Sequence, residues 1–298
     1  MNPNPNDTAA GFVALPSAGA LTVEEANQTA RSSVTRVIIP VGLAGVGKTT
    51  LLTELYGKFL QGPFAGHQYA WSRTLHGFEQ RSHHARTTSG RATPETLRTP
   101  LADRDVFLHL RLAPEEGAAP ARDLLIADWP GEEFRAMRDD VQTARAHPFL
   151  YRADHVAFLV DGGRFGTQAL RQEARHDTDM LIQSILDAGV DGAVKSVIYT
   201  KWDAALNGDG ADQLEDFVEA FEGEIRRKHE ARAGELQFIR TAARPESGSE
   251  VCRGKNLDEV LRTWLRSARR PLEVPASTGV QTTREFDRFR SSSPQRAD

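Results

Sequence analysis

The segment Gly42–Thr49, with the sequence GLAGVGKT, constrains the fold of this chain more than any other feature. It matches the pattern G-x-x-x-x-G-K-[ST], which joins a strand to a helix. The β-branched run VTRVIIPV at residues 34–41 precedes the segment and predicts that strand. The helix that follows is predicted by apolar residues at helical spacing, namely Leu51, Leu52, Leu55, Tyr56 and Phe59. The sequence therefore predicts a strand, a glycine-rich loop and a helix in succession.

A loop of this kind lets backbone N–H groups and the N-terminus of the helix point at phosphate groups. Within it, we expect Lys48 to reach the two outer phosphates and the Thr49 hydroxyl to take a Mg²⁺ position. A glycine-rich turn that only caps a helix is the alternative, and the strand before the loop disfavours it. The expected nucleotide-binding residues here are Gly42, Leu43, Ala44, Gly45, Val46, Gly47, Lys48, Thr49 and Thr50.

A second motif, D-x-x-G, ends the buried strand predicted at residues 123–128. In this motif Asp128 would hold Mg²⁺ through water, and the Gly131 amide would sense the γ-phosphate. An Asp and a Gly at a strand end are often ordinary turn residues. The position of the motif after the phosphate loop favours the functional interpretation.

A third motif, T-K-x-D, follows the strand predicted at residues 194–200. The Asp203 carboxylate can accept from both N1–H and the exocyclic amine of guanine, a donor pair that adenine lacks, while the stem of Lys201 lies along the base. Thr200 opens the motif. After the last predicted strand, Thr241, Ala242 and Ala243 would offer a backbone amide to guanine O6. The alternative is a strand-to-helix turn with a solvated lysine and an aspartate cap.

Strands alternate with helices between two polar ends of the chain, which is typical of an α/β fold with a mostly parallel sheet. About six strands are expected, at 34–41, 105–112, 123–128, 155–161, 194–200 and 236–242. The alternation of DVFLHLRL at 105–112 predicts a half-exposed antiparallel strand. Residues 1–33 and 271–298 are predicted to be flexible tails that flank one domain at 34–270.

The order of these motifs resembles that of the Ras-like P-loop GTPases of the TRAFAC type, over residues 34–270. Two features depart from that pattern: the long stretch from Lys48 to Asp128, and Thr200 where asparagine is commoner. The inserted text SRTLHGFEQRSHHARTTSGRATPETLRT looks like the bacterial double-GTPase type, which is predicted to work with other proteins in conflict and defence systems.

The resemblance implies a P-loop NTPase fold with a Ras-like mixed sheet and helices on both faces. It also implies GTP and GDP as ligands, Mg²⁺ as cofactor and slow GTP hydrolysis. Protein partners are implied too, among them a second GTPase, for a molecular switch in antiviral defence. A module that holds GTP without hydrolysing it, and so acts as a scaffold, is the alternative function.

The polar segment at residues 61–104 shows little periodicity and is predicted to be a switch I insert, ordered by contacts with the γ-phosphate rather than a second domain. Switch I needs a threonine for Mg²⁺ and the γ-phosphate, and Thr99 is the first candidate, with Thr93 and Thr96 as alternatives. His83 and His84, beside Arg81 and Arg86 in the same segment, are read either as a metal or phosphate cluster or as solvated loop residues.

The catalytic candidates are Lys48, Gly131, Glu132 and Arg98. Glu132 follows D-x-x-G, where many Ras-like enzymes carry the glutamine that orients the attacking water. A carboxylate there repels the γ-phosphate unless a cation is near, and Arg98 or a partner's arginine would supply that charge. Alternatively, Glu132 only favours the N-terminus of the next helix.

Composition excludes several other classes of function. The formal net charge of −4 provides no basic excess for nucleic acid or an anionic membrane surface. The single cysteine, Cys252, excludes an internal disulfide and a multi-cysteine zinc site. The first residues lack the pattern of a signal peptide, and no stretch is long and apolar enough for a membrane span, so a cytoplasmic location is expected.

Overall fold

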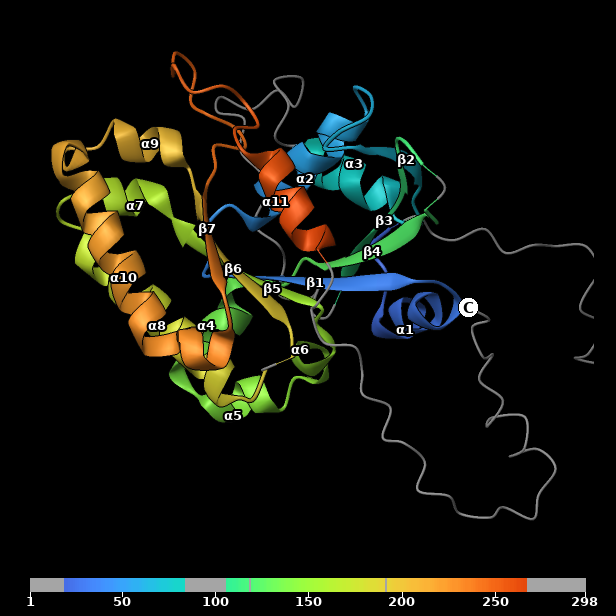
Figure 1. Cartoon of the computed structure of the whole chain (residues 1–298), viewed down its shortest axis with the longest axis horizontal. Coiled ribbons are helices and arrows are strands. Elements are labelled where there is room, and N and C mark those ends of the chain that lie inside the picture. Colours follow the sequence, from blue (N-terminus) through green and yellow to red (C-terminus); the bar gives the residue numbers. More distant parts are fainter. Residues whose placement is uncertain (1–18, 84–105, 118, 191, 267–298) are drawn as a thin grey trace, which may run out of the picture. The chain divides into compact units, whose positions relative to one another are not determined.

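The computed structural model of the protein describes residues 19–83, 106–117, 119–190 and 192–266. Within them, a seven-stranded sheet has the order β2-β3-β4-β1-β5-β6-β7 (Figure 1). Strands β4, β1, β5, β6 and β7 run parallel, whereas β2 and β3 add an antiparallel edge. The strands are Thr35–Val41 (β1), His67–Trp71 (β2), Phe107–Pro114 (β3), Arg122–Ala127 (β4), His155–Asp161 (β5), Val194–Thr200 (β6) and Leu236–Arg240 (β7).

Helices cover both faces of this sheet (Figure 1). One face carries Lys48–Phe59 (α2), Leu75–His83 (α3) and Leu257–Leu265 (α11). The other face carries Val23–Ser32 (α1), Gly131–Asp139 (α4), Val141–Arg145 (α5), Pro148–Arg152 (α6), Gly162–Gly166 (α7), Arg171–Asp187 (α8), Trp202–Leu206 (α9) and Leu214–Ala233 (α10). The expected α/β class with a mostly parallel, mixed sheet is confirmed.

The central strand shows why the sheet is covered twice. Successive side chains of a strand point to opposite faces. Ile38 belongs to the core under α2 and α11, whereas Val37 and Ile39 belong to the core under α4, α8 and α10. A continuous apolar run such as β1 is therefore buried on both faces, as parallel strands require.

The sheet has one strand more than predicted, because the polar segment at residues 61–104, to which no strand or helix was assigned, contains β2 and α3. β2 is an edge strand whose side chains are mostly exposed, so its sequence carries no buried alternation. In α3 Phe78 and Ser82 are buried, too few to produce a visible helical period. Pairing of β2 with β3, which is distant in sequence, forms the extra edge.

The predicted N-terminal tail also contains structure, since α1 lies within residues 1–33. Thr22 accepts a hydrogen bond from the Glu25 N–H, and the Glu25 side chain accepts one from the Thr22 N–H, which forms a capping box. Leu21 exchanges backbone hydrogen bonds of 2.8 and 2.9 Å with Phe107. Local capping and this bridge to β3 together order residues 21–32, which composition had suggested were flexible.

Strand β3 is antiparallel, as predicted, but it is not half-exposed. Leu108 and Leu110 face the core beneath α2, as the alternation indicated. On the opposite face Phe107 packs on Phe149 of α6, with ring centroids 4.7 Å apart. His109 is fully buried beside it: its Nδ1 accepts from the backbone N–H of residue 73, so its Nε2–H donates to Asp123 Oδ1 at 3.0 Å. Burial lowers the pKa of His109, and the Asp123 carboxylate opposes that shift.

Candidate nucleotide-binding site

The phosphate loop connects β1 to α2, as predicted, and its glycines are required by the backbone. Gly45 and Gly47 have φ angles of +78° and +92°, in the left-handed region that favours glycine. A Cβ on Gly42 would lie 2.7 Å from Val46 Cγ1, so a side chain there would displace the loop. The Gly47 carbonyl accepts from the Leu51 N–H at 2.9 Å and so begins α2.

Lys48 is folded along this loop and is nearly buried, with 7% of its surface exposed. Its Nζ donates to the carbonyl oxygens of Gly42 at 2.7 Å and Leu43 at 3.2 Å. The same ammonium lies 5.4 Å from the centre of the Phe134 ring on α4. The lysine charge is therefore held at the N-terminus of α2, where the helix dipole also favours an anion.

Thr49 and Asp128, two of the three predicted metal ligands, lie together. The Thr49 hydroxyl donates to Asp128 Oδ1 at 3.0 Å, and the Asp128 side chain is fully buried. A hydroxyl and a carboxylate are oxygen ligands of the kind that Mg²⁺ prefers. The donor set therefore fits Mg²⁺ at the first residues of α2, next to the phosphate loop.

Arg81 of α3 also contacts this carboxylate. Its Nε donates to Asp128 Oδ2 at 2.5 Å, on the oxygen opposite to the one that Thr49 contacts. The sequence placed Arg81 beside His83 and His84 in a candidate metal or phosphate cluster, but it did not predict the pairing with Asp128. Only the packing of α3 against the domain brings its side chain to the site.

Gly131 packs directly on the phosphate loop. A Cβ on Gly131 would lie 2.2 Å from the Ala44 nitrogen and 2.4 Å from the Ala44 Cα, closer than any side chain can approach backbone. Glu132 follows in the first turn of α4. The D-x-x-G motif thus joins the phosphate loop to the start of α4, and the location of Glu132 is compatible with both roles considered for it.

The T-K-x-D motif is linked to the phosphate loop through its first residue. The Thr200 hydroxyl lies 2.6 Å from the Val46 carbonyl oxygen and 3.0 Å from the Val160 carbonyl oxygen. Thr200 is 4% exposed. A threonine in this position therefore provides a short polar link between β6 and the phosphate loop, and the departure from asparagine has a structural role.

The remaining residues of the T-K-x-D motif lie at the end of β6. Lys201 has φ +49°, and its Nζ pairs with Asp161 Oδ2 at 2.8 Å. Asp203 is nearly buried, and its Oδ2 accepts from the Glu246 N–H at 2.9 Å. The Thr241 carbonyl accepts from the backbone N–H of residue 202 at 3.0 Å. The loop after β7 is thereby fixed beside the T-K-x-D motif.

Aromatic and charged side chains pack around the T-K-x-D motif. Trp202 packs edge-on against Tyr199, and the Arg240 guanidinium lies over the Trp202 ring, 5.2 Å from its centre. Burial, reinforced by the nearby Glu222 carboxylate, holds the pKa of Tyr199 well above its usual value. Burial likewise raises the pKa of Glu222. These contacts join α9 to β7 next to the T-K-x-D motif.

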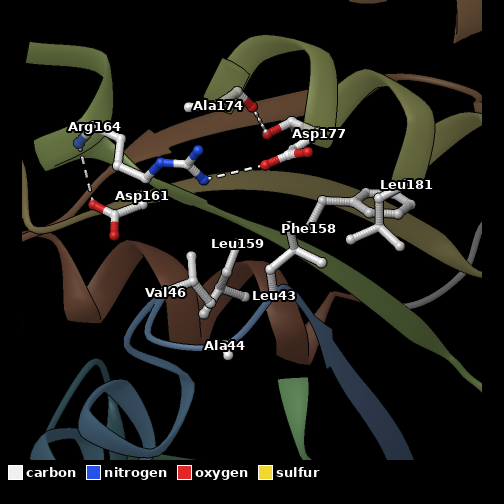
Figure 2. A pocket seen from close by; sticks show the side chains of 11 residues that line it. Leu43, Ala44, Val46, Phe158, Leu159, Asp161, Arg164, Ala174, Asp177 and Leu181 are labelled. Carbon is white, nitrogen blue, oxygen red and sulfur yellow. Dashed lines mark hydrogen bonds and ion pairs between the residues drawn. The ribbon is translucent and has the colours of Figure 1, made fainter. Parts of the chain in front are cut away.

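A small cavity lies behind the phosphate loop, between it and α8 (Figure 2). Leu43 and Val46 of the loop line one side (Figure 2). On the α8 side, Asp177 pairs with Arg164 of α7 at 3.2 Å and with Arg138 of α4 at 2.6 Å. Asp177 therefore connects the helix that follows D-x-x-G with the helix that follows β5.

Several predicted site residues fall outside the described residues, namely Thr93, Thr96, Arg98, Thr99 and His84. His83 is the last residue of α3. Among the described residues, no group of three His, Cys, Asp or Glu side chains could hold a metal ion. No helix in the described ranges has both the length and the apolar character that a membrane crossing requires.

The solved structures that this chain matches are of low sequence identity. They include the bacterial selenocysteine-specific elongation factor EF-Sec, at 15% identity over 77% of this chain and 28% of that chain, with a TM-score of 0.39. The Saccharomyces cerevisiae Ski7 GTPase-like domain, bound to GDP and inorganic phosphate, is 11% identical over 73% of this chain and 45% of that chain, with a TM-score of 0.42. The signal recognition particle receptor SRb-GTP/SRX complex from Chaetomium thermophilum gives 13% identity over 72% of this chain and 93% of that chain, with a TM-score of 0.36.

This chain thus spans less than half the length of the first two of these structures. No curated protein sequence matches it. A model of the Double-GTPase 2 family matches residues 36–265, which includes the phosphate loop, the D-x-x-G motif and the T-K-x-D motif. The chain therefore belongs to the Double-GTPase 2 family.

Proposed function

We propose that this chain binds GTP together with Mg²⁺ and hydrolyses it slowly, as a molecular switch that acts with protein partners. The observation that carries the proposal is the convergence of three motifs at one edge of the sheet. The Thr200 hydroxyl contacts the phosphate loop, and a Cβ on Gly131 would collide with the same loop. The residues proposed to bind metal, phosphate and base therefore follow β4, β1 and β6, which is their order across the sheet. A bound nucleotide with its metal ion has the same order.

Guanine selectivity rests on Asp203. Its carboxylate is nearly buried and held by the Glu246 N–H through one oxygen, which fixes the orientation of the group. A carboxylate accepts two hydrogen bonds from the N1–H and amine of guanine, and the corresponding edge of adenine lacks that donor pair. An unmatched buried carboxylate is costly, so we expect ATP to be rejected.

The phosphate end is served by this chain's own residues in three ways. Lys48 and the loop N–H groups bind the phosphate oxygens, Thr49 and Asp128 hold Mg²⁺, and the Gly131 amide contacts the γ-phosphate. Mg²⁺ neutralises charge between the β- and γ-phosphates when it is bound. In hydrolysis the water oxygen bonds to the γ-phosphorus, the bond to the β–γ bridging oxygen breaks, and its electron pair remains on GDP. Glu132 is the candidate for orienting that water.

Family membership supports a role alongside other proteins. We propose that a second GTPase or another component of a bacterial defence assembly senses the GTP-bound state. The switch I function then belongs to the segment between α3 and β3, with Thr99 as the proposed Mg²⁺ ligand.

Competition binding tests the assignment of the base. Displacement of a fluorescent GDP analogue should require far less GTP than ATP for the wild type. Asp203→Asn replaces one acceptor by a donor, so the preference should move from guanine to xanthine nucleotides. Equal displacement by ATP and GTP would refute the base assignment, and Asp209→Asn, on the loop after α9, is a matched control that should leave the preference unchanged.

A further inference from the structure

Arg81 projects from a helix that is anchored on both sides. Phe78, one turn before it, is fully buried and stacks on Tyr56 of α2, with ring centroids 4.6 Å apart and 15° between the rings. Thr74, just before α3, accepts from the His109 N–H at 2.8 Å through its hydroxyl. Because α2 begins with Lys48, α3 is fixed relative to the phosphate loop. Arg81 is therefore presented to the site by packed structure.

The contacts of Arg81 place its charge on the carboxylate that is expected to serve Mg²⁺. Its Nε donates to Asp128 Oδ2 at 2.5 Å, and its Nη1 donates to the Gly77 carbonyl at 3.2 Å. The Arg81 side chain is 12% exposed and that of Asp128 is fully buried. Thr49 contacts the other oxygen of the same carboxylate. An ion pair this buried constrains both partners, unlike an exposed pair.

We propose that Arg81 and Mg²⁺ compete for Asp128, and that the Arg81 guanidinium moves onto the phosphate oxygens of GTP when Mg²⁺ takes the carboxylate. This inference rests on the proposed function. A divalent cation at Asp128 repels the guanidinium, whereas the nearby triphosphate attracts it. A guanidinium is also well suited to phosphate, because its planar fork donates two parallel hydrogen bonds.

The transfer would place a cation beside the γ-phosphate. Negative charge spreads over the γ-phosphate oxygens during hydrolysis, and an arginine supplied by the same chain can stabilise it. Arg81 thereby replaces Arg98 as the arginine that we assign to the reaction. Asp128 would hold the guanidinium when Mg²⁺ and GTP are not bound, so that the same arginine is used in both states.

The competition is tested by the Mg²⁺ dependence of GDP binding, which requires no hydrolysis. Release of a fluorescent GDP analogue is measured over a range of Mg²⁺ concentrations for wild type, Arg81→Ala and Arg73→Ala. Arg81→Ala should shift the midpoint to Mg²⁺ concentrations lower by about fivefold or more, the usual lower bound for coupled sites. Arg73, which precedes α3 and lies over the Trp71 ring, should leave the midpoint unchanged when replaced.

An unchanged midpoint in Arg81→Ala would overturn the competition. Where Arg81→Ala does not fold, Arg81→Gln is measured instead, because it keeps an N–H donor for Asp128 and loses the charge, and the same direction is expected. Arg81→Lys should keep a midpoint close to that of the wild type, since its charge is retained. A wild type that binds no GDP would overturn both the inference and the proposed function.

Single-turnover GTP cleavage at saturating Mg²⁺ tests the transfer to phosphate. Arg81→Ala should be slower than wild type by about 1,000-fold or more, as expected for a lost arginine finger. Arg81→Lys should also be slow, because an ammonium lacks the planar fork, and Arg73→Ala should match the wild type. A shifted Mg²⁺ midpoint with a normal cleavage rate would overturn the transfer. A wild type that binds GDP but cleaves no GTP would refute the proposed hydrolysis, while the midpoint would still decide the competition.

Discussion

The contact between Gly131 and the phosphate loop predicts a large effect for the smallest possible substitution. In Gly131→Ala the new Cβ would lie 2.2 Å from Ala44 N, 2.4 Å from Ala44 Cα and 2.6 Å from the Leu43 carbonyl carbon. All three atoms belong to the backbone, so no side-chain rotation relieves the overlap. Either α4 or the phosphate loop must move.

The size of the effect follows from two opposing terms. Overpacking by added carbon typically costs about 1–3 kcal/mol, and a backbone collision belongs at the upper end. Alanine has the better helix propensity, by about 1 kcal/mol, which offsets part of that cost at the first residue of α4. A net loss of about 2 kcal/mol lowers the melting temperature of a domain of this size by about 4–8 °C.

Gly57→Ala is the matched control, because Gly57 lies inside α2 and a Cβ there meets no atom within 4 Å. It should raise stability by about 0.5–1 kcal/mol. Thermal unfolding of both variants without nucleotide measures the change in stability of the fold, and GDP binding measures displacement of the phosphate loop. Gly131→Ala with the stability and GDP affinity of the wild type would refute the close packing of D-x-x-G on the phosphate loop.

Three further predictions concern other parts of the molecule. Lys48→Ala should abolish tight GTP and GDP binding and leave thermal unfolding without nucleotide nearly unchanged; unchanged affinity would count against the phosphate site. Glu132→Gln and Glu132→Ala, compared by single-turnover cleavage, should differ from wild type if Glu132 orients water, and equal rates would leave only its role in the first turn of α4. Burial lowers the pKa of His155 from 6.5 to about 3. Below pH 6.5 this imidazole is therefore protonated in the unfolded chain, whereas it stays neutral in the folded protein. The contribution of His155 to the free energy of unfolding is therefore fully present above pH 6.5, and it falls by about 1.4 kcal/mol per pH unit as the pH drops toward 3. Denaturant unfolding should therefore show a smaller loss between pH 7 and 5 for His155→Gln, and equal losses would exclude the buried imidazole as a source.

The motif residues could be predicted from sequence because their chemistry depends on local spacing. Gly42–Thr49 needs only a strand before it and a helix after it, and both are evident from apolar periodicity. Asp128 directly follows the buried strand β4 and Thr200 ends β6, and parallel strands bring their carboxyl ends to one edge of the sheet. The candidate site could therefore be assembled from one-dimensional information.

What the sequence did not reveal depends on contacts between distant residues. β2 is held by pairing with β3, and its own side chains are largely exposed, so no pattern marks it. Arg81 is one arginine among many, and only the stacking of Phe78 on Tyr56 places it beside Asp128. The structured N-terminal helix is a different case, because the capping box at Thr22 was present as a readable signal.

Slow hydrolysis of GTP at the phosphate loop is tested by measuring the release of inorganic phosphate from GTP or ATP by the purified wild-type protein with Mg²⁺. We expect slow release from GTP, no detectable release from ATP, and loss of the GTP signal in Lys48→Ala. Release from ATP at the same rate, or from GTP in Lys48→Ala at the wild-type rate, would contradict it. So would the absence of any release from GTP by the wild type.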